Sequence, residues 1–134
     1  IKMATTTATL TLSSADLTGD ALSLSTTATL TKAGTVTGLD QFTGIARQTF
    51  TQNTILTLID KTLYDADGAH KVYIKNTSTT ATENIIVTIE SQALGRLYAG
   101  DWVLLPFNGE QDIKITPSVN TAMTIEYAVI YQQV

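Results

Sequence analysis

The sequence predicts an all-β protein that folds as a two-sheet antiparallel β-sandwich. Threonine is a β-branched residue that favours strands over helices, and it occurs 26 times in 134 residues. Apolar residues alternate with polar ones in several short segments of the carboxyl-terminal half. These segments recur at intervals of roughly ten residues and are separated by turn residues, a spacing typical of a sandwich.

Length and charge restrict the classes of protein to be considered. The length indicates a single domain over residues 1–134. The net charge is -4 and the eight lysines and arginines are scattered, which argues against a nucleic-acid partner. No apolar run approaches a membrane span and the amino terminus has no signal-peptide core, so we expect a soluble chain that is neither exported by the usual route nor anchored. Because cysteine is absent, the fold uses no disulfide and no thiolate metal site.

The amino-terminal segment, residues 4–30, consists almost entirely of threonine, serine, alanine and leucine. Leucines at alternate positions, Leu10 with Leu12 and Leu22 with Leu24, predict two half-buried strands with a turn at residues 18–20. The first dozen residues hold few apolar anchors. We therefore expect residues 1–12 to form an extended arm that becomes ordered against a partner.

Residues 33–44 contain three glycines and Phe42, and they predict a long irregular loop with an interfacial role. The next segment, residues 47–59, has two interpretations. Phe50, Ile55 and Ile59 fit strand spacing, whereas Leu56, Ile59 and Leu63 would equally line one face of a helix. We favour the strand because the segment is rich in threonine.

Five strands follow in the carboxyl-terminal half. They are expected at residues 71–75, 85–89, 102–107, 113–115 and 123–131, with a polar loop at 76–84 and turns at 99–101 and 108–109. The strand at 102–107 is apolar at consecutive positions, which predicts that a sheet covers one face and a neighbouring segment or subunit the other. Its Trp102 and Phe107 are expected to anchor the core, each contributing about 1.5–3 kcal/mol by burial. On this view Trp102→Ala is among the costliest substitutions.

Residues that carry catalytic chemistry are sparse. His70 is the only histidine and is expected on the surface or in a turn. Asp101 and Asp112 flank the strand at 102–107, but both lie beside turns, where aspartate is favoured for backbone reasons. The run Tyr-Asp-Ala-Asp-Gly at residues 64–68 resembles a fragment of a calcium loop, yet it lacks a third acid and the distal glutamate, so a plain turn is favoured. We expect a non-enzymatic protein without catalytic residues, cofactor or metal.

Two surface features remain open in the sequence. Residues 76–78, Asn-Thr-Ser, match the acceptor pattern for glycosylation, which has low specificity without a secretory context. The aromatic residues Tyr98, Trp102, Tyr127 and Tyr131 would form a sugar-stacking platform if they were exposed. Their strand spacing favours packing in the core or at a subunit interface instead.

The strand motifs resemble those of small jelly-roll virion proteins of tailed bacteriophages, over residues 71–127. The motifs that carry the resemblance are KVYIKNTS at 71–78, NIIVTI at 84–89, AGDWVLLPF at 99–107, DIKITPS at 112–118 and MTIEY at 123–127. The resemblance implies a jelly-roll-like sandwich, here with an extended amino-terminal arm, and a structural role on a phage particle. The amino-terminal third departs from the pattern.

The most direct function implied is that of a head decoration or cement protein. Such a protein would be assembled in the host cytoplasm, lie on the head exterior and bind the major capsid protein. It would form a homo-oligomer, and a trimer is favoured over a dimer. The expected interface residues are Phe42, Phe50, Tyr98, Trp102 and Phe107. The alternatives are a tail or fibre component and a carbohydrate-binding adhesin module.

Overall fold

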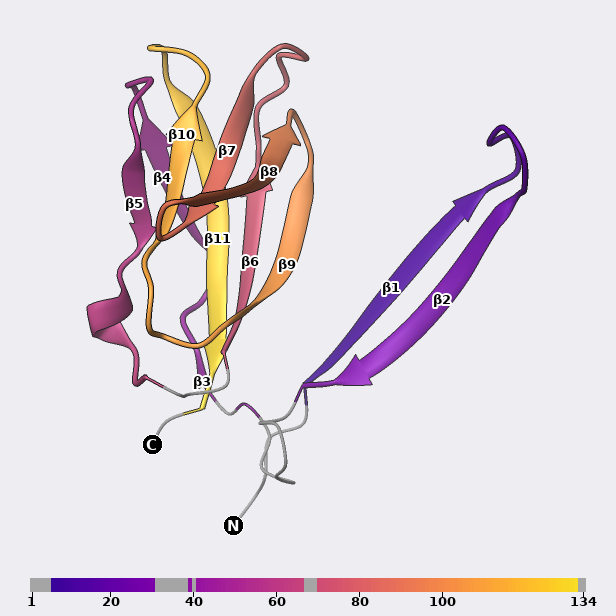
Figure 1. Ribbon diagram of the computed structural model, residues 1–134, viewed down its shortest axis with the longest axis horizontal. Helices are drawn as coiled ribbons and strands as arrows, with labels where there is room; N and C mark the ends of the chain where they lie inside the picture. Colours follow the sequence, from indigo (N-terminus) through magenta and orange to yellow (C-terminus); the bar gives the residue numbers. More distant parts are fainter. Residues whose placement is uncertain (1–5, 31–38, 40, 67–69, 133–134) are drawn as a thin grey trace.

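The computed structural model describes residues 6–30, 39, 41–66 and 70–132 of the chain (Figure 1). Within these residues the regular structure consists of strands and one short 3-10 turn, η1 (Lys61–Leu63). Every strand pair in the described ranges is antiparallel. The predicted all-β class is therefore confirmed.

Two sheets form the layers of a β-sandwich (Figure 1). One layer has the order β5 (Leu56–Ile59), β10 (Ile113–Pro117), β7 (Asn84–Ile89) and β8 (Gln92–Tyr98). The other has the order β3 (Gln41–Phe42), β11 (Met123–Tyr131), β6 (His70–Asn76) and β9 (Trp102–Phe107), and β4 (Ala46–Phe50) also pairs with β11. A third sheet is a hairpin of β1 (Thr7–Ser14) and β2 (Leu22–Thr29), which extends away from the sandwich in Figure 1.

The core lies between the two layers and is built from the inward faces of the strands. On β6, Val72 and Ile74 are fully buried, whereas the intervening Tyr73 is only partly covered. The predicted alternation of this strand is thus confirmed. The other buried members of the core come from both layers: Phe50, Leu58, Ile59, Ile85, Val87, Leu105, Phe107, Ile113, Ile115, Met123, Ile125 and Val129.

The segment at residues 47–59 is extended, as favoured, but it forms two strands in different layers. β4 pairs with β11, and β5 pairs with β10. Between them Asn53 secures the crossing, because its backbone N–H donates to Asn120 Oδ1 at 2.7 Å and its side-chain amide to the carbonyl of Ser118 at 3.2 Å. The alternative helical interpretation of this segment is therefore wrong.

Asn76 connects the two layers at the end of β6. Its side chain is fully buried, and Nδ2 donates to the carbonyl of Leu97 on β8 at 3.1 Å and to that of Glu83 at 3.4 Å. Its Oδ1 accepts a hydrogen bond from the backbone N–H of Ser78 at 3.0 Å. The amide that a glycan would need is therefore buried and hydrogen-bonded, so the acceptor pattern at residues 76–78 has a structural role in the folded chain.

Gly109 allows the loop after β9 to approach the segment that follows η1. Its φ is +75°, and a Cβ at this position would lie 2.5 Å from the carbonyl oxygen of Asp65. We expect Gly109→Ala to lower the free energy of unfolding by about 2–3 kcal/mol, because the backbone conformation and the close contact are both unfavourable for alanine. Urea denaturation followed by circular dichroism measures this loss.

Gly100→Ala is the matched control. Its φ is +84°, but a Cβ there would meet nothing within 4 Å. This variant should lose only the backbone contribution, about 1 kcal/mol. Equal losses for the two variants would contradict the role assigned to the contact between Gly109 and Asp65.

Candidate functional site

The hairpin has two faces of opposite character. The register pairs Ala8 with Ala28, Leu12 with Leu24 and Thr9 with Thr27. One face therefore carries Ala8, Leu10, Leu12, Ser14, Leu22, Leu24, Thr26 and Ala28, which we call the leucine face. The other carries only hydroxyl side chains: Thr7, Thr9, Thr11, Ser13, Ser23, Ser25, Thr27 and Thr29. Strand alternation produces this segregation, because successive side chains point to opposite faces.

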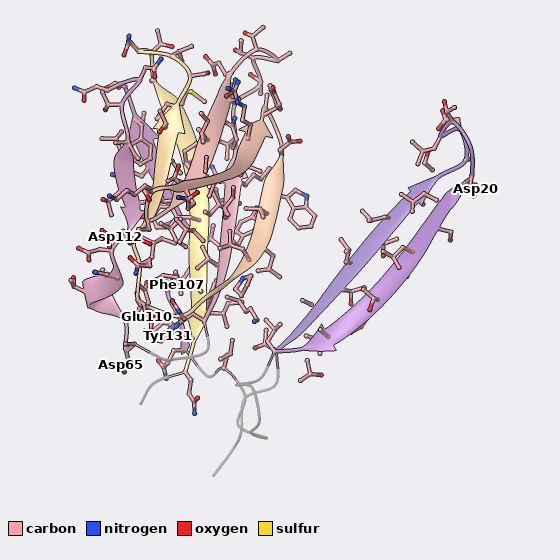
Figure 2. The ribbon with its side chains drawn as sticks, viewed as in Figure 1. Asp20, Asp65, Phe107, Glu110, Asp112 and Tyr131 are labelled. Carbon is pink, nitrogen blue, oxygen red and sulfur yellow. The ribbon has the colours of Figure 1, made fainter. Side chains whose placement is uncertain are left out.

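The leucine face is uncovered. Leu10, Leu12, Leu22 and Leu24 expose 37%, 41%, 37% and 43% of their surface. The two strands contain no ionisable residue, and Asp16 and Asp20 lie in the turn that joins them. Figure 2 shows Asp20 at the tip of the hairpin, far from Asp65 and Asp112 on the sandwich. The sequence predicted the two strands and the turn correctly, but the prediction that the strands are half-buried is wrong, because every residue of the two strands except Ala8 and Ser14 is exposed.

Strand β9 presents a second uncovered apolar surface. It is an edge strand whose one partner is β6 in the described part of the chain. Leu105 and Phe107 point into the core, whereas Trp102, Leu104 and Pro106 are exposed on the outside, which we call the outer face of β9.

Trp102 exposes 54% of its surface, so the prediction that it anchors the core is wrong. A run of consecutive apolar residues predicts that both faces of a strand are covered. In β9, among the described residues, only the inner face is buried in the core.

A cleft of about 250 Å³ separates the base of the hairpin from the outer face of β9. Its walls are Ala8, Thr9, Leu10, Thr26 and Ala28 on one side and Trp102 and Leu104 on the other. These lining residues include no ionisable side chain. The indole therefore lies in an open cleft that can make apolar and hydroxyl contacts but has no group for acid–base chemistry.

The predicted interface residues separate into two groups. Phe42, Tyr98 and Trp102 are exposed and available to a partner. Phe50 and Phe107 belong to the core, so their rings have no free surface to offer. Phe42 lies in the short strand β3, within the segment expected to be a long loop, while residues 33–38 and 40 of that loop lie outside the described residues. Of the predicted arm, residues 7–12 belong to β1 and residues 1–5 lie outside the described ranges.

The two aspartates considered for catalysis stabilise turns. Asp101 Oδ2 accepts a hydrogen bond from the backbone N–H of Tyr98 at 2.9 Å, and Asp112 Oδ1 accepts one from the N–H of Lys61 at 2.9 Å. Each carboxylate thus satisfies a backbone donor, which is the role that their positions beside turns predict. In the part of the chain that the structure describes, no three histidine, aspartate or glutamate residues are grouped to hold a metal ion.

His70 is a core residue, so its predicted place on the surface or in a turn is wrong. It is buried at the start of β6, and its Nδ1 lies 3.1 Å from the carbonyl oxygen of Phe107. Tyr64 packs edge-on against His70, Phe107 and Tyr131 with ring centroids 5.4, 5.8 and 5.3 Å away. Figure 2 shows Phe107 and Tyr131 near one end of the sandwich. Burial raises the pKa of the Tyr64 phenol.

The outer face of the β6–β11 sheet carries a small ionic network. Arg47 Nε donates to Glu126 Oε2 at 2.9 Å, the Arg47 Nη2 lies 2.9 Å from the same oxygen in an ion pair, and the Tyr73 hydroxyl donates to Glu126 Oε1 at 3.1 Å. The hydrogen bonds from Arg47 and then Tyr73 hold the pKa of the Glu126 carboxyl below its ordinary value of 4.5. Burial, followed by the bond to Glu126, raises the pKa of Tyr73.

The lowered pKa of Glu126 gives a pH dependence with a defined sign. The network stabilises the fold fully above pH 4.5, and this contribution is lost as the pH falls through the lower pKa of the folded state. We expect a carboxyl NMR titration of Glu126 to have its midpoint below 4.5, and Arg47→Ala to raise that midpoint. Arg96→Ala, on the other layer, is the control and should leave it unchanged. A midpoint insensitive to Arg47→Ala would contradict the assignment.

No family model, curated protein or solved structure matches this chain. In the described ranges there is also no helix with the length and hydrophobicity needed to cross a bilayer.

The candidate functional site consists of the uncovered leucine face, the outer face of β9 and the cleft between them.

Proposed function

We propose that this chain is a non-enzymatic structural protein of a tailed-phage particle, a head decoration protein that binds the major capsid protein lattice and stabilises the shell. The observation that supports it most is the uncharged hairpin whose leucine face is uncovered beside the exposed Trp102 and Leu104. Burying apolar surface at about 25 cal/mol per Å² favours association between proteins. The resemblance of residues 71–127 to jelly-roll virion proteins supplies the phage context.

The proposal includes a jelly-roll sandwich with the amino-terminal hairpin as its arm, placed on the head exterior. Each copy would contribute a modest interface, and many copies would strengthen the shell through multivalency. The proposal also includes a homo-oligomer, for which we favour a trimer over a dimer. An oligomer increases the number of contacts that each binding unit makes. Phe42 and Tyr98, which are both exposed, are available for further contacts at the shell.

Co-sedimentation with phage heads that lack their decoration protein tests the proposal. Purified chain should bind such heads saturably, and bound heads should withstand a higher temperature before releasing DNA. Heads already decorated serve as the control and should take up no more. Absence of head binding together with a few copies in purified tails would overturn the proposal in favour of a tail or fibre component.

A carbohydrate-binding adhesin module is the second candidate, and the exposure of two aromatic residues favours it. Trp102 exposes 54% and Tyr98 48% of its surface, and the two residues flank the turn between β8 and β9. Exposed aromatic faces can stack on sugars. Binding to a glycan array that disappears in Trp102→Ala, with an unchanged circular dichroism spectrum, would support this function. A lack of binding across the array would exclude it for the glycans presented.

A further inference from the structure

We propose that copies of this chain exchange hairpins: the leucine face of one copy packs on the outer face of β9 in a second copy, and each copy both gives and receives. The inference goes beyond the proposed function, because it assigns the partner and the two surfaces that meet. The hairpin exchange does not depend on which larger particle the oligomer binds.

The hairpin needs cover to be stable. A two-stranded hairpin alone is marginally stable in water, because it has no second layer against which to bury its apolar residues. Here both strands pair only with each other in the described part of the chain. The opposite face consists of hydroxyl side chains, so the hairpin is suited to lie on an apolar surface with its threonines and serines toward solvent.

The sandwich of the same copy leaves most of the leucine face open. The cleft beside Trp102 is lined by residues at the base of the hairpin, Ala8, Leu10, Thr26 and Ala28 among them. Leu12, Leu22 and Leu24, nearer the tip, do not line it and stay exposed. Figure 1 shows the hairpin diverging from the sandwich toward this tip. The described part of the same copy therefore leaves the tip half uncovered and accessible to another molecule.

The chain itself carries a surface of the required chemistry. Because the hairpin strands hold no charge, they fit a receiving surface that is apolar and uncharged. Trp102, Leu104 and Pro106 provide an apolar strip on the edge strand. Their paired neighbours on β6, Lys75, Tyr73 and Lys71, border this strip with side-chain stems, and the ammonium groups of the two lysines can reach solvent. Each copy thus has one donor and one acceptor surface, and within the copy only the base of the hairpin lies beside the acceptor.

The area of the contact favours exchange over a one-way contact. A strand of eight residues extends about 26 Å, and a two-stranded ribbon about 10 Å wide has a face of about 260 Å². One hairpin lying on β9 together with the adjoining β6, a surface two strands wide, would hide about 500 Å² in total, which is typical of weak crystal contacts. Exchange in a closed dimer doubles this to about 1,000 Å², the lower limit for a specific interface. A closed trimer would hide about 1,500 Å² by the same reasoning.

Disulfide trapping tests the proposed pairing in the full chain, which has no cysteine of its own. A Leu12→Cys chain is mixed with a Leu104→Cys chain and oxidised. We expect a disulfide between the two different chains at more than ten times the yield obtained with Thr11→Cys in place of Leu12→Cys. Thr11 is the matched control, since it is the neighbouring residue on the hydroxyl face.

Two other results would overturn the exchange. Predominant disulfides between two Leu12→Cys chains would indicate that hairpins pack on each other. A disulfide within one chain of the double variant Leu12→Cys/Leu104→Cys, with no linkage between chains, would indicate that the hairpin folds onto its own sandwich.

Oligomeric state supplies an independent measurement. Native mass should show a closed oligomer for the unmodified chain and for Thr11→Asp, and monomers for Leu12→Asp. Because Trp102 is the only tryptophan, its emission should shift to shorter wavelength as the unmodified chain is concentrated, and Leu12→Asp should abolish that shift. A monomeric unmodified chain would overturn the exchange, whereas failure to bind phage heads by an intact oligomer would overturn only the decoration role.

Discussion

Ile74→Ala is expected to lower the free energy of unfolding by about 3–4 kcal/mol, a loss at the upper end for substitutions to alanine in the described core. Ile74 lies on β6, the strand between β9 and β11, and its side chain is completely buried. Truncation to alanine removes buried apolar surface from the core. It also leaves a cavity, because the other side chains keep the two layers apart. Urea denaturation followed by far-ultraviolet circular dichroism measures the loss.

Trp102→Ala is the informative comparison, although its side chain is larger. Trp102 lies outside the core and keeps half of its surface exposed in a single copy. At protein concentrations that keep the chain monomeric, we expect a loss below about 1 kcal/mol, as for other surface substitutions. Circular dichroism serves both variants, since the second lacks the only tryptophan. A larger loss for Trp102→Ala than for Ile74→Ala would show that the indole is part of the monomer core.

Asn76→Leu is expected to cost about 3 kcal/mol, although leucine is of similar size and more hydrophobic. The substitution removes the donor to the carbonyl groups of Leu97 and Glu83 and the acceptor for the N–H of Ser78. Each buried polar group left without its partner costs about 1–3 kcal/mol. Because Asn76 links β6 to β8 in the opposite layer, the variant should also speed hydrogen exchange in β8, which NMR can follow residue by residue.

Asn53→Leu is the matched control for Asn76→Leu. Its amide also donates to a backbone carbonyl, that of Ser118, but the bond is exposed and water can replace it. The expected loss is below about 1 kcal/mol. If the two variants lost the same stability, burial would not be the reason for the importance of Asn76.

Alternation within strands made much of the sandwich predictable. Val72 with Ile74, and Ile113 with Ile115, lie on inward faces because successive side chains of a strand point in opposite directions. That rule needs no knowledge of the neighbouring strands. The turn residues were equally informative, since Gly19, Gly100 and Gly109 adopt the positive φ that glycine permits.

The same rule could not state which faces are covered. Leu10 and Leu12 share one face of β1 in the sequence and in the structure, yet that face is exposed. The apolar run of β9 was expected to be covered on both sides, but Trp102 lies outside. His70 gave no periodic signal of burial, and it is buried because β6 pairs with β9 and brings the carbonyl of Phe107 to its ring.

By itself, the sequence determined the all-β class, most strand positions and the division of the alternating strands, such as β6 and β10, into an inward and an outward face. The tertiary structure alone decided that residues 47–59 divide between two layers, that Asn76 joins those layers and that the leucine face and Trp102 remain open. Strand faces follow from the local geometry of the backbone, whereas burial depends on which distant segments come to lie against each face.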